Sequence, residues 1–163
     1  MIFVTVGAQM PFDRLIRAVD EWAAVRNRKD VLAQIGRTNL RPKMISAVPF
    51  VDPKEFRDRV SEASIVVAHA GMGSIITALE LRKPIIVMPR RGSLMETRND
   101  HQVATAKHLQ DLGRVAVAFD ERELVLKLDD PVCDHHGKID LHASSQLINA
   151  LRAFLAQPIK TGR

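Results

Sequence analysis

At residues 63–74 the chain reads Ala63-Ser64-Ile65-Val66-Val67-Ala68-His69-Ala70-Gly71-Met72-Gly73-Ser74. The apolar first half has the composition of a buried parallel strand. Residues 75–81 that follow are long enough, with their flanks, to form a helix. A strand that passes through a glycine turn into a helix aims free backbone N–H groups at an anion, and glycine lets a phosphate come close. We therefore predict a phosphate-binding turn, with Ser74 adding a hydroxyl at the helix start.

The glycine spacing excludes one common phosphate motif and departs from another. The third glycine of a dinucleotide fingerprint is missing, because that position is Ile76. No Gly-Lys-Ser/Thr follows, which excludes a P-loop. A tight strand-to-helix turn without a ligand is the simpler alternative for so short a motif. The choice between the two depends on the rest of the chain.

The composition is typical of one soluble domain with a real core. Of 163 residues, 46% are hydrophobic and 26% are charged. We expect no transmembrane helix, since no run reaches about 18 apolar residues, and residues 1–7 are too short and lack the basic flank of a signal peptide. The single cysteine, Cys133, permits no internal disulfide and fits a reducing cytosol.

The charge of the chain leaves several classes of ligand open. A net charge of +5 suits nucleic acid, an anionic membrane surface or a phosphorylated ligand, although it also serves ordinary solubility. Aromatic residues make up only 4% and tyrosine is absent, which argues against a platform that stacks single-stranded bases. We therefore do not expect a nucleic-acid partner.

Apolar runs and helical periodicities alternate along the chain. They predict a Rossmann-like α/β fold, a parallel sheet with helices on both faces. Strands are expected at 1–6, 31–36, 44–48, 63–68, 85–88 and 115–117, with helices between them, one of them from about 98 to 112 and ended by Gly113. The nucleotide-binding domain would span 1–128, followed by a linker at 129–138, a C-terminal helix within 139–157 that packs on the domain or on a partner, and a tail at 158–163.

Two further segments should lie at the same sheet edge as the glycine turn, because parallel strands all end there. Gly7-Ala8-Gln9 follows the first strand and forms a second glycine turn. The polar loop 89–102 follows the fifth strand. It carries donors and acceptors suited to sugar hydroxyls, and arginines that could meet a phosphate or an acidic sugar. These residues are Arg90, Arg91, Asn99, Asp100, His101 and Gln102. The alternative is a solvated loop with surface arginines.

Residues 69–113 resemble the C-terminal, nucleotide-sugar-binding lobe of glycosyltransferase family 28, a lobe of the GT-B type. The shared features are His-Ala-Gly-x-Gly-Ser, then Lys83-Pro84 before an apolar strand that ends in Pro89, then Asn-Asp-His-Gln before a helix and Gly113. Residues 4–9 with Phe12-Asp13-x-Leu15 are similar to the stand-alone form of this lobe. That form is the catalytic subunit of two-part UDP-sugar transferases, in bacterial exopolysaccharide synthesis and in the eukaryotic dolichol pathway. The resemblance covers about residues 1–120.

The resemblance implies roles for individual residues. The diphosphate would be held by the turn Ala70-Gly71-Met72-Gly73-Ser74 and closed in from the first turn by Gly7, Ala8 and Gln9. Phe50 and Val51 would lie near the uracil, and Asn99, His101 and Gln102 would touch the donor sugar. Many relatives carry a ribose-binding glutamate where this chain has Thr77, and Glu80 lies one helical turn further on.

The resemblance further implies an inverting, metal-independent transfer of a hexose from a UDP-sugar to a lipid-linked acceptor. A helix N-terminus would stabilise the leaving UDP, and a base would activate the acceptor hydroxyl. His69 and His101 are the candidate bases, although a histidine at a strand end is often structural. The alternative is a non-catalytic, regulatory subunit that binds the UDP-sugar.

Partners and cofactors follow from the same resemblance. A GT-B enzyme has two lobes and this chain supplies one, so a membrane-anchored second polypeptide would carry the acceptor site. The chain would then lie in the cytoplasm at the inner face of the membrane; self-association stays open. No cofactor or metal is implied, and the spacing of Cys133, His135, His136 and His142 matches no structural zinc pattern.

Overall fold

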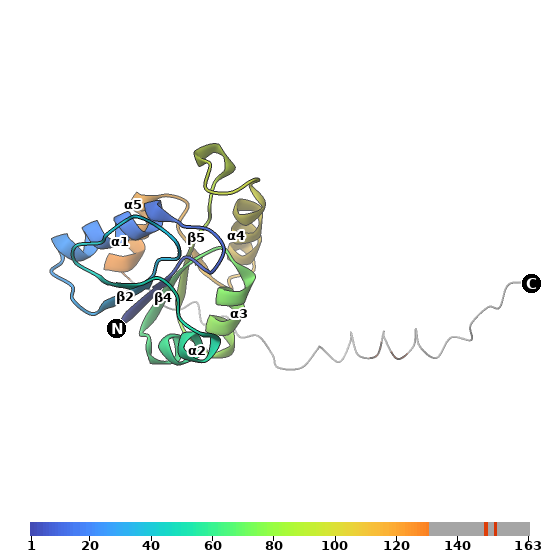
Figure 1. Cartoon of the computed structure of the whole chain (residues 1–163). Coiled ribbons are helices and arrows are strands. Elements are labelled where there is room, and N and C mark those ends of the chain that lie inside the picture. The colour runs from blue at the N-terminus through green and yellow to red at the C-terminus, as the bar shows by residue number, and fades with distance from the viewer. Residues whose placement is uncertain (131–148, 150–151, 153–163) are drawn as a thin grey trace, which may run out of the picture.

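The computed structural model describes residues 1–130 together with Asn149 and Arg152 (Figure 1). Six parallel strands form one sheet in the order β3-β2-β1-β4-β5-β6. The strands are β1 (Ile2–Thr5), β2 (Val31–Gln34), β3 (Ser46–Val48), β4 (Ile65–His69), β5 (Ile85–Met88) and β6 (Ala116–Val117). The order along the sheet reverses between β1 and β4. Ligands of open parallel sheets bind outside the carboxyl ends of the strands at this point, and we call it the switch-point edge.

Helices cover both faces of the sheet, as predicted. They are α1 (Asp13–Val25), α2 (Pro53–Glu62), α3 (Met72–Glu80), α4 (His101–Asp111) and α5 (Glu121–Asp129), with a short 3-10 helix, η1 (Gly92–Leu94). Side chains alternate along each strand: Ile2 and Val4 of β1 pack with α1 and α5, whereas Phe3 packs with α2 and α3. Both faces of the strands are therefore apolar, which explains their continuous hydrophobic runs.

Several element boundaries differ from the prediction by a few residues, and for two of them side-chain hydrogen bonds give the reason. α4 begins at His101 and not near residue 98, because Asn99 Oδ1 accepts the main-chain N–H of His101 and Asp100 Oδ1 accepts that of Gly92. These bonds hold the chain in a turn. β3 begins at Ser46 and not at residue 44, because the amides just before it donate to the Asp20 carboxylate.

Short-range hydrogen bonds and backbone geometry set the helix ends at three places, and the end at Gly113 is the predicted one. Asp52 accepts from the Glu55 amide at 2.8 Å and begins α2, and Asp120 accepts from the Glu123 amide at 2.8 Å and begins α5. Gly113 ends α4 with φ +62°. In the described part of the chain no helix is long and apolar enough to cross a membrane. The predicted linker beyond residue 130, the C-terminal helix and the tail lie outside the described residues, apart from Asn149 and Arg152.

Candidate functional site

The two glycine turns meet at one histidine. β1 and β4 are paired neighbours, so the turns after them lie side by side at the switch-point edge. A Cβ added to Gly7 would lie 2.6 Å from Cε1 of His69, and one added to Gly71 would lie 2.1 Å from its Nε2. Real Cβ atoms do not come this close to other atoms, so both turns require glycine. The imidazole of His69 is therefore enclosed by the main chain of both turns.

His69 is held in its neutral form by this enclosure. Burial, and next the charge of Arg90, lower the pKa of His69 to about 4, although the Thr5 carbonyl opposes the shift. Its Nδ1 is buried and has no hydrogen-bond partner among the described residues. At neutral pH the ring is thus uncharged, and one of its nitrogens is an N–H donor.

The first turn of α3 supplies the main-chain donors that the sequence predicted. Gly71 is the N-cap residue, and no side chain among the described residues caps the helix. Met72, Gly73 and Ser74 are the first three helical residues, so their N–H groups have no acceptor within the helix. The space beside Gly73 is open, since a Cβ there would meet nothing within 4 Å. This helix end can therefore receive an anion.

The loop after β1 is shaped by its neighbours as well as by Gly7. Gly7 has φ +78°, and its N–H donates to the Thr5 hydroxyl at 3.1 Å. Gly36, which follows β2, approaches this loop closely and its N–H donates to the Pro49 carbonyl at 2.9 Å. Ala8 and Gln9 are exposed at the tip of the loop.

The predicted base-binding residues lie further out along the same edge. Phe50 and Val51 follow Pro49, and the Phe50 side chain is 42% exposed. A cavity of about 450 Å³ opens between the ends of β2 and β3, lined by Gly36, Arg37, Thr38, Arg41, Ala47 and Pro49 among others. None of the predicted site residues lines it.

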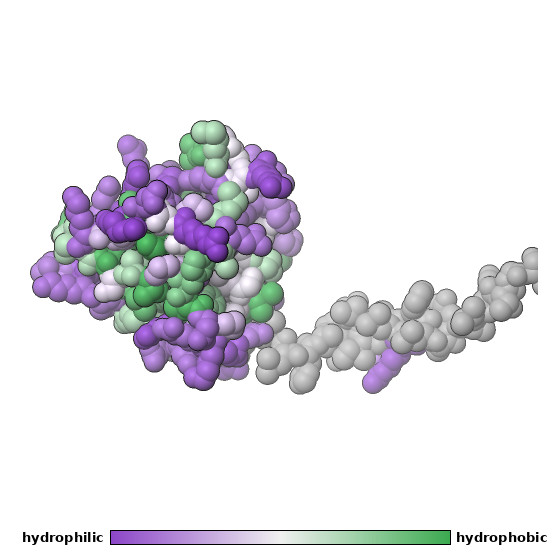
Figure 2. Space-filling view, viewed as in Figure 1, coloured by the Kyte–Doolittle hydropathy of each residue, from purple (hydrophilic) through white to green (hydrophobic). Residues whose placement is uncertain are grey.

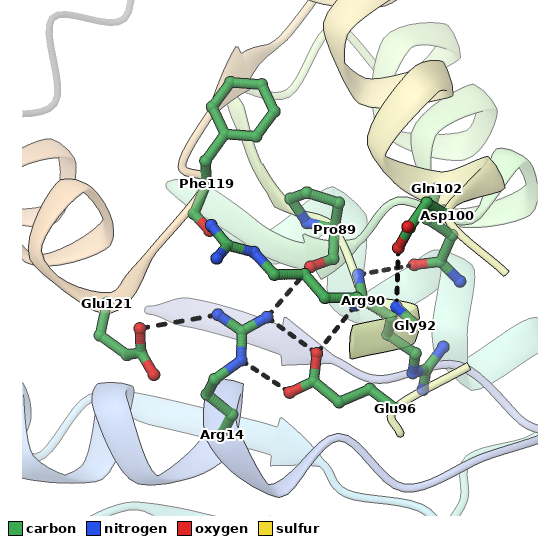
Figure 3. Close-up of polar contacts among 10 residues, drawn as sticks. Arg14, Pro89, Arg90, Gly92, Glu96, Asp100, Gln102, Phe119 and Glu121 are labelled. Carbon is green, nitrogen blue, oxygen red and sulfur yellow. Dashed lines mark hydrogen bonds and ion pairs between the residues drawn. The ribbon is translucent and has the colours of Figure 1, made fainter. Parts of the chain in front are cut away.

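The polar loop after β5 reaches the same edge and projects from the body of the protein (Figure 1). Gln102 is half-buried, and its Oε1 accepts the main-chain N–H of Arg90 at 3.1 Å, which leaves its NH₂ group available (Figure 3). Asn99 and His101 are exposed at the start of α4. The structure thus gathers these three predicted sugar contacts around the beginning of one helix.

The structure corrects the expectation for the arginines of this loop. Arg90 is only 4% exposed, and its guanidinium donates to the Val6 carbonyl at 2.8 Å and to the Met10 carbonyl at 2.5 Å. The Arg91 guanidinium donates to the Phe119 carbonyl at 2.6 Å. Arg90 therefore shapes the loop after β1 and does not present its charge to a ligand. Burial lowers the pKa of Arg90, and the charge of Glu96 opposes this.

Sequence reasoning missed a largely buried ion pair between Arg14 and Glu96. Arg14 Nε donates to Glu96 Oε1 at 2.6 Å, and its Nη2 donates to Glu96 Oε2 at 2.9 Å and to the Pro89 carbonyl at 3.1 Å (Figure 3). Burial lowers the pKa of Arg14, but the hydrogen bond and charge of Glu96, followed by Glu121, outweigh it and raise the pKa. Arg14 is the unspecified residue of Phe12-Asp13-x-Leu15 and Glu96 lies within the polar loop 89–102, but nothing local indicates that residues 82 positions apart would pair.

Thr77 and Glu80 are both engaged within or between helices. The Thr77 hydroxyl donates to the Gly73 carbonyl of its own helix at 2.9 Å. The Glu80 carboxylate accepts from Arg57 of α2 at 3.0 Å. Among the described residues no three histidine, cysteine or acidic side chains gather as a metal site would require; Cys133, His135, His136 and His142 lie outside them.

Comparison with known proteins places this geometry in a family. The family model described as "Glycosyltransferase family 28 C-terminal domain" matches residues 1–146. The UDP-N-acetylglucosamine transferase subunit ALG13 of Homo sapiens is 32% identical over 124 residues, which is 70% of this chain. The matched region is only 10% of that relative's length.

Solved structures show the same fold. An NMR structure of ALG13 superimposes with a TM-score of 0.59 at 20% identity and covers 92% of this chain and 93% of its own. The glycotransferase of kitacinnamycin superimposes with a TM-score of 0.60 at 21% identity over 93% of this chain and 39% of its own. This chain is thus one GT-B lobe of the C-terminal type, and it belongs to the glycosyltransferase family 28 C-terminal domain family.

Proposed function

We propose that this protein is the donor-binding, catalytic subunit of an inverting, metal-independent UDP-sugar glycosyltransferase that transfers a hexose to a lipid-linked acceptor. The observation that carries the proposal is the meeting of two glycine turns at His69, beside an uncapped helix N-terminus. The name of the human relative supports a UDP-sugar as donor.

The diphosphate would lie against the first turn of α3. Main-chain N–H groups there carry the positive end of the helix dipole and need no metal ion to bind an anion. Negative charge builds up on the leaving UDP during transfer, so fixed donors at this position would stabilise the transition state more than the bound substrate. Neutral His69 can add one N–H donor from between the turns.

The donor sugar would lie toward Asn99 and Gln102, and the acceptor beyond it. Of the two candidate bases, His69 lies against Gly7 and Gly71, the turns that would hold the diphosphate. His101 is exposed at the start of α4, where an acceptor hydroxyl can reach it. We therefore assign proton removal from the acceptor to His101.

A membrane-anchored partner would cover the switch-point edge and supply the acceptor site. Of nine exposed large hydrophobic side chains in the described part of the chain, six lie on loops at this edge or on the first two turns of α3. They are Met10, Phe50, Met72, Ile76, Leu94 and Met95. Figure 2 shows the apolar tip of the projecting β5–α4 loop, where Met95 is 90% exposed. Apolar surface concentrated in this way is typical of a protein interface.

Calorimetric titration of the purified chain with UDP, in the presence of EDTA, tests the donor site. We expect binding without added metal, weakened by Ser74→Ala and by Gln102→Ala. The matched controls are Ser61→Ala on α2 and Gln110→Ala at the other end of α4, both exposed positions. Absence of UDP binding, or equal binding by all four variants, would refute the proposal.

A second candidate function is a regulatory subunit that binds a UDP-sugar without taking part in transfer. Thr77 favours it, because this position carries no carboxylate for the ribose and its hydroxyl is bonded within α3. Transfer assays over a panel of UDP-sugars, with the chain co-expressed with its membrane partner, separate the two. A His101→Ala variant that binds UDP normally but supports no transfer would favour the catalytic assignment.

A further inference from the structure

Two arginines make reciprocal contacts across the switch-point edge. Arg14 of α1 reaches the loop after β5, where it binds Glu96 and the Pro89 carbonyl. Arg90, from that loop, reaches back to the loop after β1 and binds the Val6 and Met10 carbonyls. β1 and β5 are not neighbours, since β4 lies between them. The two contacts therefore join loops that no backbone pairing joins.

One aromatic ring connects the two arginines. The guanidinium carbons of Arg14 and Arg90 lie 5.2 Å and 5.1 Å from the centre of the Phe12 ring, and Phe12 is 1% exposed. Buried cation–π contacts of this kind are stronger than exposed ones. Movement of either arginine would thus disturb the other through the shared ring.

Glu96 fixes the shape of the second loop. Besides Arg14 it accepts the main-chain N–H of Arg91 at 3.0 Å, and its side chain is 12% exposed (Figure 3). The same stretch is held at its end by Gln102, which accepts the Arg90 amide, and by Asp100, which accepts the Gly92 amide. The residues that would meet the donor sugar are therefore positioned by the arginine contacts.

We infer that Arg14, Glu96 and Arg90 are positioning residues that fix the distance between the two halves of the donor site. One half is the Gly7–Gln9 turn, which would close in the diphosphate. The other half is the Asn99–Gln102 segment, which would meet the sugar. The inference rests on the proposed function. The arginine contacts touch no substrate themselves; they decide whether one ligand can reach both halves at once.

The test uses Arg14→Lys, which keeps the charge but loses the two-pronged contact, and Glu96→Gln, which keeps the shape but loses the charge. Arg17→Lys, at an exposed position on the same helix, is the matched control. Affinities for UDP and for UDP-N-acetylglucosamine are measured by calorimetry, with the melting temperature recorded for each variant. We expect both variants to bind UDP within about threefold of wild type. The ratio of the dissociation constant for UDP to that for UDP-N-acetylglucosamine, which measures how much the sugar adds to binding, should fall about tenfold.

A purely structural role would instead lower the melting temperature and weaken both ligands in equal proportion, leaving the ratio of the two dissociation constants unchanged. That result would overturn the inference, as would a wild-type protein that binds UDP and the UDP-sugar equally well. If wild type binds neither ligand, the proposed function fails.

Hydrogen exchange tests the mechanical coupling without any nucleotide. In both variants, amides at 6–12 and at 89–98 should exchange about fivefold faster than in wild type, while those of β2 stay unchanged. Faster exchange in only one of the two loops would show that they are not coupled and would overturn the inference even if the UDP site is real.

Discussion

Replacing Gly71 with alanine would place a methyl group where the fold has no room for it. The added Cβ would lie 2.1 Å from His69 Nε2 and 2.6 Å from its Cε1. Gly71 has φ −99° and ψ 128°, which any residue adopts, so the cost is steric and not conformational. Forcing extra volume into a packed site typically costs about 1–3 kcal/mol, and we expect Gly71→Ala to lower the free energy of unfolding by that amount.

The neighbouring glycine is the matched control. A Cβ on Gly73 would meet nothing within 4 Å, and Gly73 is helical. Gly73→Ala should therefore leave stability unchanged or raise it by about 0.5–1 kcal/mol. In a His69→Ala background the obstructing ring is gone, so Gly71→Ala should cost less than about 0.5 kcal/mol there. The double-mutant cycle then gives a coupling of about 1–3 kcal/mol between Gly71 and His69.

Urea unfolding followed by tryptophan fluorescence measures all of these variants. Trp22 is the one tryptophan of the chain, and it is 4% exposed, so its emission reports the loss of the core. If the effects of Gly71→Ala and His69→Ala add within about 0.5 kcal/mol, the ring does not lie between the glycine turns.

Three further predictions follow from individual contacts. Burial lowers the pKa of His69 to about 4 from the ordinary value of 6.5, so between about pH 6.5 and pH 4 the unfolded chain binds a proton that the folded chain does not. Stability should fall by up to roughly 3 kcal/mol as the pH drops through this window, and His69→Asn should remove that part of the urea-unfolding pH profile. Asp20 accepts from the amides of Lys43, Met44 and Ile45 at 2.8–3.1 Å, so Asp20→Ala should cost about 2–4 kcal/mol in urea unfolding, whereas the exposed Asp58→Ala should cost about 0–1. The double change Leu94→Ser with Met95→Ser should leave UDP affinity intact but weaken co-purification with the proposed membrane-anchored partner. Leu112→Ser, at a similarly exposed position, should not weaken it, and equal retention of both variants would contradict the proposed partner surface.

Most of the fold could be predicted because its signals are local. A short apolar run followed by small residues predicts strand β4, the glycine turn and α3. The capping residues Asp52 and Asp120 accept from main-chain amides three positions away. The errors lie at element ends, where contacts outside the local repeat decide the boundary. The start of α4 moved to His101 because Asp100 bonds to Gly92, eight residues earlier and outside any helical repeat.

The amino-acid order fixes the parallel sheet, its helices and the two glycine turns, since periodicity and capping depend on neighbours within one or two turns of chain. It does not fix the roles of Arg14 and Arg90, whose partners lie 75 to 84 positions away, nor the neutral state of His69. Those properties arise when the sheet brings distant loops together and removes water from their charges. Burial and pairing are properties of the folded surroundings. Arg90 is therefore buried and binds main-chain carbonyls, although its sequence context predicted an exposed side chain that contacts a ligand.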